Sequence, residues 1–355
     1  MQKDFFLFIL ITTFTLLFLT SIFLIAILIL RLFAYLEANN EKKFIMKNES
    51  RIFDYIYGSE TSQNLVSLIS PYRYSNLLSY CRNLLFNLKG ADAERLVGLL
   101  NDPKIIKYIF RLHKSWRKKK RIRGIYFFRF IKSSGVVDVL MEELKSRDEL
   151  IVETAIESLA YLNCYEKINE ILDIVSGHRD INADMLFSLI NKFDKSICPI
   201  ITGRLATEKS GIILQVILAI LWHHKYSDAK EIVMSLLSKT RDDKVILEII
   251  KYLEEIEDPD TMHMLEMALK SSRAEVRIAA IKAVSKIGLG SLDDLIIEKF
   301  HDTQLAVKIA AAKALLKHSE KGKKMLFELT KSNSERVDVI IAKRVFMERR
   351  VSGNV

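Results

Sequence analysis

The sequence predicts an all-α protein in which a single N-terminal transmembrane helix is followed by an α-solenoid of stacked helical hairpins. Three observations support this prediction. The chain has 355 residues but only 4 Pro and 12 Gly, too few turn formers for a fold built from many short strands. An uncharged apolar run lies near the N-terminus, and the C-terminal part repeats itself at a spacing of about 31 residues, as solenoids do.

The apolar run extends from Phe5 to Leu30, 26 residues without a charge. As a helix it would be about 39 Å long, more than the ~30 Å hydrocarbon core of a bilayer, so it can cross with some tilt. A signal peptide has only about 7–15 apolar residues and a small-residue cleavage site, which is absent here. We therefore predict a transmembrane anchor over residues 1–36.

Basic residues flank this run unevenly. Only Lys3 precedes it, whereas five basic residues follow it closely: Arg31, Lys42, Lys43, Lys47 and Arg51. The positive-inside rule then places the C-terminal part in the cytoplasm. The predicted localisation is the inner (cytoplasmic) membrane of a bacterial cell, single-pass, with the C-terminal domain in the cytoplasm. The isolated cysteines Cys81, Cys164 and Cys198 fit this reducing compartment.

The repeats are clearest near the C-terminus. Residues 274–288 read AEVRIAAIKAVSKIG and residues 305–317 read LAVKIAAAKALLK, and the two superpose at a spacing of 31. We call such segments first helices. Second helices follow them, marked by Leu265, Ile296 and Phe327 at the same spacing. A hairpin of this kind buries its apolar face only against its neighbours, so we predict a stacked array whose concave surface is lined by the second helices.

Turn-forming residues fall where this array needs them. Asp102-Pro103 has the form of a helix start, and Asp148 and Asp242 precede predicted first helices, where a carboxylate can accept from free backbone N–H groups. Gly288 follows a helix, where a left-handed cap is expected. We divide the rest of the chain into a helical membrane-proximal region at 37–115, a cap or degenerate repeats, and a repeat solenoid at 116–355.

The segments VRIAA at 276–280 and VKIAA at 307–311 resemble HEAT repeats, closest to the short bacterial type found in proteins similar to phycobilin lyases. The resemblance implies that the basic residues Arg277 and Lys308 and a preceding aspartate such as Asp302 form a ladder between repeats. Ser271 stands one repeat before Asp302, so we expect the ladder to be interrupted there. The small residues at positions 280 and 311, Ala280 and Ala311, are expected to let neighbouring helices approach closely.

Sequence motifs for chemistry are missing. We find no dinucleotide or phosphate-binding glycine loop and no nucleophile elbow. His223 and His224 are adjacent, so on a helix they point about 100° apart and do not form a metal-binding i, i+4 pair. We therefore predict no catalytic residue, cofactor or metal, and a protein that is not an enzyme.

Charge is distributed unevenly along the chain. Residues 33–135 hold 20 Lys and Arg against 8 Asp and Glu, a net charge of +12, whereas residues 136–355 hold 32 against 35, a net charge of −3. The densest basic segment is Lys114–Arg123, KSWRKKKRIR. Its seven basic residues are Lys114, Arg117, Lys118, Lys119, Lys120, Arg121 and Arg123. If the segment is one helix, Lys114, Arg117, Lys118 and Arg121 form a single stripe.

Three interpretations of this basic segment stay open. It is a solvated face of a repeat helix, or it contacts anionic lipid of the inner leaflet, where each basic residue is worth about 1 kcal/mol, or it binds a phosphate-bearing ligand or nucleic acid. The acidic C-terminal repeats and the membrane anchor argue against nucleic acid.

The functional prediction is a membrane-anchored cytoplasmic HEAT-repeat scaffold that mediates protein–protein interaction with a membrane-associated protein partner. By resemblance to similar anchored HEAT proteins, the partner belongs to an envelope or polysaccharide-synthesis assembly. The alternative, by resemblance to the bilin-lyase-like HEAT proteins, is a cofactor-handling enzyme or chaperone with a pocket ringed by His, Asp and Arg.

Overall fold

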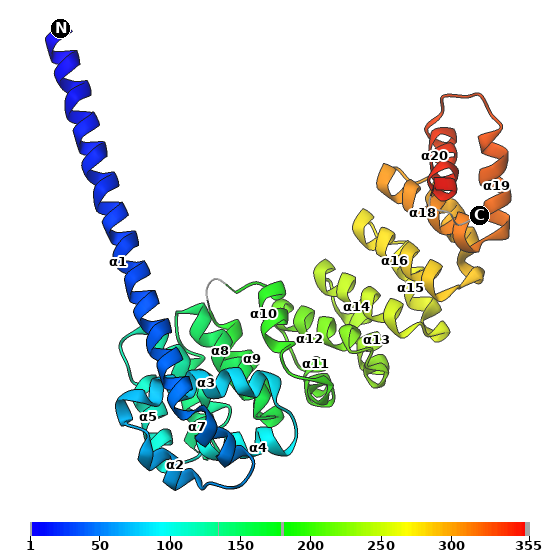
Figure 1. Ribbon diagram of the computed structural model, residues 1–355. Coiled ribbons are helices and arrows are strands. Elements are labelled where there is room, and N and C mark those ends of the chain that lie inside the picture. The colour runs from blue at the N-terminus through cyan, green and yellow to red at the C-terminus, as the bar shows by residue number, and fades with distance from the viewer. Residues whose placement is uncertain (1, 134, 179–180, 352–355) are drawn as a thin grey trace. The chain divides into compact units, whose positions relative to one another are not determined.

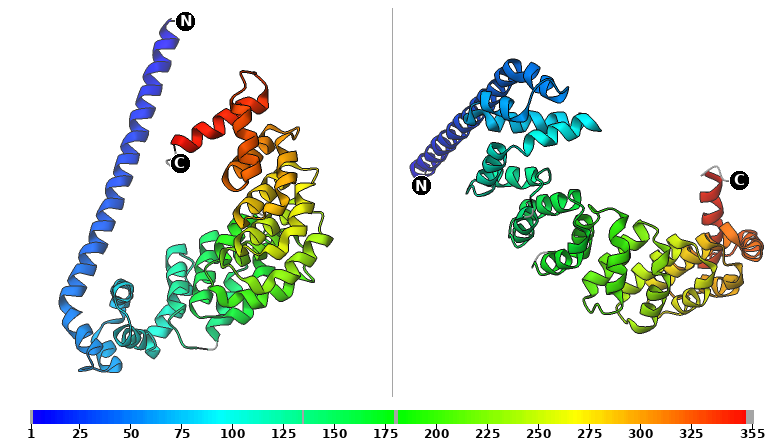
Figure 2. Two further views of the ribbon diagram at one scale, coloured as in Figure 1. Left: turned by 90° about the vertical axis from the view of Figure 1, so that its right-hand side faces the viewer. Right: turned by 90° about the horizontal axis from the view of Figure 1, so that it is seen from below.

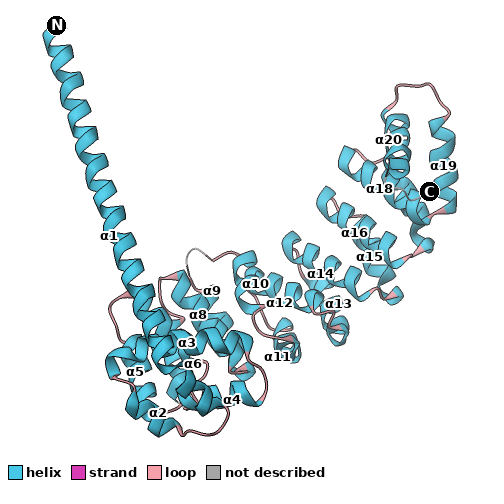
Figure 3. Ribbon diagram, viewed as in Figure 1, coloured by secondary structure: helices cyan, strands magenta, loops and turns pink. Residues whose placement is uncertain are grey.

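The structure is a computed structural model that describes residues 2–133, 135–178 and 181–351. Every secondary-structure element in these ranges is a helix (Figure 3), which confirms the predicted all-α fold. The chain divides into two compact units, unit 1 over Met1–Val136 and unit 2 over Val137–Val355. Each unit is described by itself below.

Unit 1 begins with the long helix α1 (Gln2–Ile56). One stretch of this helix is long and apolar enough to cross a membrane. The mean hydropathy of its most apolar 18 residues is 2.7, and none of these residues is buried. Phe18, Phe23 and Leu30 are each 68–69% exposed. Figure 2 shows no other helix of unit 1 beside this first part of α1.

The second part of α1 packs against a small bundle in unit 1 (Figure 1). Its buried residues Phe44, Asn48, Ile52 and Ile56 recur every four positions, as expected for one face of a helix. Three helices cover this face: α2 (Ser62–Leu68), α3 (Tyr74–Asn87) and α4 (Ala91–Leu100).

Two tyrosines tie α1 to this bundle. Tyr80 on α3 donates to Glu49 Oε1 at 3.0 Å, and Tyr55 donates to the Arg95 carbonyl at 2.8 Å. Burial and the hydrogen bond with Glu49 raise the pKa of Tyr80 to about 12, so its hydroxyl keeps its proton and remains a donor at neutral pH.

The last helices of unit 1 are α5 (Pro103–His113) and α6 (Lys118–Phe128), which pack against each other. Asp102 caps α5 as predicted and accepts from Lys104 N–H at 2.9 Å. Gly124 permits the close contact, because a Cβ there would lie 2.5 Å from the backbone nitrogen of His113. Both α5 and α6 fall within unit 1, which ends at Val136.

Unit 2 is a series of helices in hairpin order that opens with α7 (Gly135–Glu143). The first helices are α8 (Glu149–Tyr161), α10 (Ala183–Ile190), α12 (Gly211–His223), α14 (Asp243–Ile256), α16 (Ala274–Ile287), α18 (Leu305–His318) and α20 (Val337–Val351). The second helices are α9 (Ile168–Ser176), α11 (Cys198–Leu205), α13 (Lys230–Lys239), α15 (Met262–Leu269), α17 (Asp293–Phe300) and α19 (Glu320–Thr330). Short 3₁₀ turns lead into most second helices.

These helices form two rows. Each first helix from α8 to α18 packs on the next first helix, and second helices contact one another along the other row. Each pair is thus covered by its neighbours, the arrangement predicted from the 31-residue spacing. In the view of Figure 1, α12, α14, α16 and α18 lie along the inner side of the bend and α11, α13 and α15 along the outer side.

The prediction that second helices line the concave surface is therefore wrong. First helices contact one another extensively along their row, whereas contacts between second helices are sparse, so the array bends toward the first row. On α16 and α18, the small residues Ala280, Ala283, Ala311 and Ala314 lie buried, at most 7% exposed, and permit this close contact.

Helix caps fall where the sequence placed them. Asp148 accepts from Leu150 N–H at 3.1 Å, and Asp242 accepts from Lys244 N–H at 2.9 Å. Gly288 ends α16 with φ of 81°, a left-handed conformation that favours glycine. These caps fix the loop between one helix of a pair and the next.

Substituting leucine for Ala280 or Ala311 is expected to destabilise unit 2. Both alanines are fully buried, and added methylenes in a close-packed seam typically cost about 1–3 kcal/mol. Thermal unfolding of the detergent-solubilised protein checks this, with the exposed Ala306 changed to leucine as the matched control in α18. Equal melting temperatures for Ala311→Leu and Ala306→Leu would contradict close packing at this seam.

Candidate functional site

The basic segment Lys114–Arg123 lies in unit 1 and is divided between two helices. Because α5 ends at His113 and α6 begins at Lys118, the single helical stripe expected of Lys114, Arg117, Lys118 and Arg121 is not formed. Lys114, Arg117, Lys119 and Lys120 are exposed, whereas Arg121 and Arg123 are half-buried. Trp116 stands in the turn between the helices, 89% exposed, with the Arg117 guanidinium 5.3 Å from its ring centroid.

Arg123 has a structural role within unit 1. It donates to Ser75 Oγ at 2.8 Å, to Ser79 Oγ at 2.9 Å and to the Ser75 carbonyl, all on α3. These bonds join α6 to α3, so Arg123 belongs to the packing of the bundle and is not displayed for a ligand.

The remaining basic residues gather at an unfavourable end of α6. Lys118, Lys119, Lys120 and Arg121 occupy its first turn, which has no acidic residue. The N-terminal end of a helix carries partial positive charge, so each cation there typically costs about 0.3–1 kcal/mol when exposed. An anionic surface beside this turn would offset that cost.

The length of α1 limits which anionic surface the turn can reach. Phe44 is the first buried side chain described on α1, and about 21 Å of helix separates it from Leu30 at the end of the apolar run. The attraction of an anionic leaflet falls off within about 10 Å. A bilayer around the apolar run would therefore meet the bundle of unit 1 only if α1 were strongly tilted.

The inter-repeat ladder implied by the resemblance is present in unit 2. Arg277 donates from Nε and Nη2 to the two carboxylate oxygens of Asp302, both at 2.8 Å, and from Nη1 to the carbonyls of Ser271 and Ser272 at 2.8 and 2.9 Å. The Arg277 and Asp302 side chains are only 9% and 8% exposed. Lys308 makes a similar contact to the next repeat, with Asp338 on α20 at 2.9 Å, although the residue one repeat after Asp302 is Asn333.

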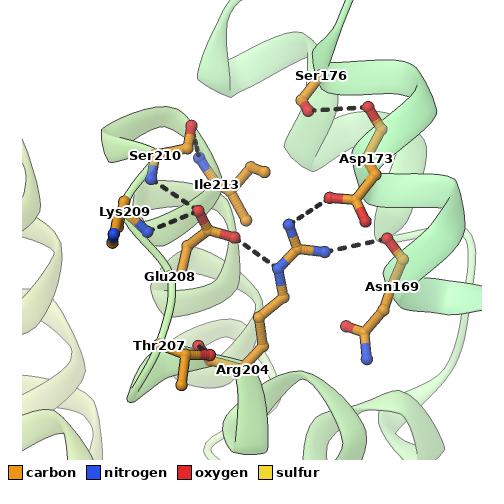
Figure 4. A network of polar contacts seen from close by, with 9 residues as sticks. All are labelled: Asn169, Asp173, Ser176, Arg204, Thr207, Glu208, Lys209, Ser210 and Ile213. Atoms are coloured by element: carbon orange, nitrogen blue, oxygen red, sulfur yellow. Dashed lines mark hydrogen bonds and ion pairs between the residues drawn. The ribbon is translucent and has the colours of Figure 1, made fainter.

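A second polar clamp, centred on Arg204, was not predicted from the sequence (Figure 4). Arg204 on α11 donates to Asp173 Oδ1 at 2.5 Å and to the Asn169 carbonyl at 3.0 Å, both on α9, and to Glu208 Oε2 at 2.6 Å. The other oxygen of Glu208 accepts from the N–H groups of Lys209 and Ser210 at 2.8 and 2.7 Å. The clamp thus joins consecutive second helices to the loop that starts α12.

The sequence feature that could have predicted this clamp is the spacing between oppositely charged residues. Asp173 and Arg204 are 31 residues apart, and so are Glu255 and Lys286, which pair at 2.6 Å. Ion pairs at one repeat length connect equivalent positions of adjacent hairpins, a pattern that a search for catalytic motifs does not detect.

One cavity of about 680 Å³ lies in the first repeats of unit 2. Val152, Ile174 and Leu189 give it an apolar lining, and Lys145, Arg147, Glu149 and His178 give it a polar one. The His178 ring is fixed by a 2.7 Å contact between Nε2 and the Leu144 carbonyl. Among the described residues that line the cavity there is one His and one Arg but no Asp.

The three cysteines singled out in the sequence are buried. Burial raises the pKa of Cys81 to about 12 and of Cys198 to about 11, so both thiols stay protonated at neutral pH and are poor nucleophiles. His223 and His224 lie at an interplanar angle of 84°. Within the described ranges, no group of three or more His, Cys, Asp or Glu is placed to hold a metal ion.

Unit 2 is expected to lose stability in acid. The Lys308 hydrogen bond lowers the pKa of Asp338. Burial acts to raise the pKa of Asp302, but the hydrogen bonds from Arg277 and Gln304 outweigh it, and that pKa is lowered too. A carboxyl with a lowered folded-state pKa stabilises the fold above its unfolded pKa of about 3.9, and this stabilisation is lost as the pH falls below that value.

Melting temperatures measured from pH 7 to pH 3 should therefore be level down to about pH 5 and then fall. Asp302→Asn should be less stable at pH 7 and should show a shallower fall in acid. An Asp302→Asn variant with the same pH dependence as the unmodified protein would show that this carboxyl does not contribute.

A series of hairpins whose helices form two rows, held by inter-repeat polar contacts, defines unit 2 as an α-solenoid, a helical repeat protein. The family model for HEAT repeats matches residues 199–285 and 231–315, which cover α12–α17 completely and parts of α11 and α18. Among solved structures, the X-ray structure of Escherichia coli YibA matches with 17% identity and a TM-score of 0.37, over 68% of this chain and 96% of YibA. No curated protein matches the chain.

Proposed function

We propose that this protein is a membrane-anchored scaffold without catalytic activity, in which α1 crosses the inner membrane and the cytoplasmic solenoid binds a membrane-associated protein. The observation that supports this most directly is the apolar part of α1, whose best 18-residue window is not buried by any other part of the protein. Exposed apolar surface of this size is unfavourable in water and is covered in a bilayer.

The solenoid supplies the binding surface. Stacked repeats present a long surface in which equivalent positions recur from hairpin to hairpin, suited to a partner that makes many small contacts. Anchoring confines both proteins to the membrane plane and raises their effective concentration. An envelope or polysaccharide-synthesis assembly is the setting we propose for the partner, on the basis of the sequence resemblance alone.

Fractionation and crosslinking test this proposal in steps. The protein should remain in the membrane pellet after an alkaline wash, and a C-terminal fluorescent fusion should fold and fluoresce in the cytoplasm. Crosslinking in native membranes should recover a partner that is lost on deletion of residues 243–335. Release by the alkaline wash would overturn the anchor, and retention of every partner by the deletion variant would overturn the solenoid as the binding element.

We further propose that the basic turn between α5 and α6 contacts anionic lipid when α1 is tilted. A fragment of residues 40–355 should co-sediment more strongly with anionic than with neutral vesicles at low salt, because each basic residue near such a surface contributes about 1 kcal/mol. Changing the exposed Lys114, Arg117 and Lys119 to glutamine should remove most of the difference. Equal sedimentation with both vesicles would contradict the lipid contact.

The cavity lined by Arg147 and His178 favours a second candidate, a cofactor-handling protein. Its charged rim and apolar lining suit an amphipathic anion such as a tetrapyrrole with carboxylate groups. Visible absorbance in purified protein, lost in an Arg147→Ala variant, would support this candidate. Colourless protein that binds no added tetrapyrrole would remove it.

A further inference from the structure

The first helices of unit 2 carry basic residues at one repeated position. Lys251 on α14, Lys282 on α16, Lys313 on α18 and Arg344 on α20 are each 31 residues from the next. All four are exposed. We call these four residues the basic row.

The burial of their neighbours places the basic row on the outward edge of each helix. The two residues before and the two residues after Lys251, Lys282 and Lys313 are all buried. At 100° per residue, these neighbours cover both flanks and the back of the helix, so each lysine points away from the stack. Because α14, α16, α18 and α20 pack in sequence, the repeated position of the four residues forms a row across the array.

An apolar row runs beside the basic row, four residues earlier on each helix. It consists of Leu247, Ile278, Ile309 and Ile340. Three of these side chains are half-buried, and Ile340 is 54% exposed. The two rows are therefore about one helical turn apart, and together they form a strip of paired apolar and basic positions.

Internal ion pairs engage three of the four residues of the basic row. Lys251 pairs with Glu248, and both Lys313 and Arg344 pair with Glu348. On α16 and α18, the residues four positions after the row are also basic, Lys286 and Lys317, and Lys286 pairs with Glu255 on α14. Exposed ion pairs of this kind are weak, so an acidic partner can compete for these cations.

We propose that this strip binds an extended acidic segment of a partner protein, with one acidic side chain for each first helix. Packed helices are about 8–10 Å apart, and a polyproline II chain advances about 3.1 Å per residue with three residues per turn. Every third side chain then faces the array at a spacing of about 9 Å. The partner is expected to carry Asp or Glu at every third position, with apolar residues between them to cover the apolar row.

This inference rests on the proposed scaffold function and adds the chemistry of its partner. The test uses the full-length protein in detergent and a neutral-dye-labelled peptide of four Glu-Pro-Ile repeats, with binding followed by fluorescence anisotropy. The peptide should bind, and its affinity should fall as salt rises. The same peptide with lysine in place of glutamate should not bind.

Charge reversal then locates the site. Lys282→Glu with Lys313→Glu should weaken peptide binding at least tenfold, whereas Lys270→Glu with Lys324→Glu on the second helices should change it less than threefold. Lys270 and Lys324 are exposed and carry the same charge, so they form a matched control. Circular dichroism verifies that each variant is folded, and a Lys282→Gln variant provides a milder change if the reversal unfolds the array.

Three outcomes would overturn the inference. They are peptide binding that survives the Lys282/Lys313 reversal, equal binding of the lysine peptide, and tighter binding of single-stranded DNA than of the acidic peptide with the same loss on reversal. Crosslinking shows whether only the proposed acidic-segment site is wrong or the proposed scaffold function is wrong as well. A partner still captured by the Lys282/Lys313 variant but lost on deletion of residues 243–335 would leave the scaffold intact and remove only the basic row from its binding surface.

Discussion

Changing Arg277 to alanine is expected to destabilise unit 2 by about 3–5 kcal/mol, because it leaves the Asp302 carboxylate nearly buried and without its cation. Arg277 also satisfies the carbonyls of Ser271 and Ser272, so one substitution removes four hydrogen bonds between the end of α15, the start of α16 and the next repeat. For a domain of this size each kcal/mol lowers the melting temperature by about 2–4 °C.

Two further variants separate charge from geometry at this site. Arg277→Lys should fall between the unmodified protein and Arg277→Ala, since an ammonium cannot form the two-point contact with the carboxylate. Joint replacement of Arg277 and Asp302 by leucine should restore part of the stability, because no buried charge is then left unpaired.

The matched control for Arg277 is Lys313→Ala. Lys313 contacts Glu348 at 2.9 Å, close to the 2.8 Å between Arg277 and Asp302. The Lys313 and Glu348 side chains are 55% and 42% exposed, so little change in stability is expected. Equal melting temperatures for the Arg277→Ala and Lys313→Ala variants would contradict a stabilising role for the ladder.

The second large effect is expected at Tyr252. This residue on α14 is fully buried, and its hydroxyl donates to the Tyr226 carbonyl at 2.8 Å, in the loop that follows α12. Tyr252→Ala would remove a large aromatic ring from the contact between adjacent repeats and leave a cavity, which typically costs about 3–5 kcal/mol.

Tyr252→Phe isolates the hydroxyl from the ring. It keeps the packing and removes one hydrogen bond, so a loss of only about 0.5–1.5 kcal/mol is expected. Chemical unfolding followed by tryptophan fluorescence measures both variants, since Trp222 lies on the neighbouring helix α12. A phenylalanine variant as unstable as the alanine variant would mean that the hydrogen bond, and not the packing of the ring, stabilises this contact.

Sequence periodicity was sufficient for the repeated part of the fold. The apolar and small residues of segments 274–288 and 305–317 predicted hairpins stacked at a spacing of 31, and the structure has this arrangement. Helix caps at Asp102, Asp148 and Asp242 were predictable because capping depends on residues that are close in sequence. The apolar run of α1 was evident because apolar character over a given length is a property of composition alone.

The candidate surfaces were less predictable. The basic segment Lys114–Arg123 was found from composition, but its break at the end of α5 was not, since Gly124 and the contact of α6 with α5 decide where the helix ends. The Arg204 clamp and the basic row required equivalent positions to be aligned across repeats, which becomes possible once the register of the helices is known.

The sequence by itself determined the helical class, the repeat length, the apolar segment of α1 and the caps, because each depends on local composition or on a short periodic pattern. Only the tertiary structure decided which row of helices lies inside the bend, which basic residues serve packing and which face outward, and where unit 1 ends. These features depend on how closely helices far apart in sequence approach one another, and that distance is set by the packing of whole side chains across the interface.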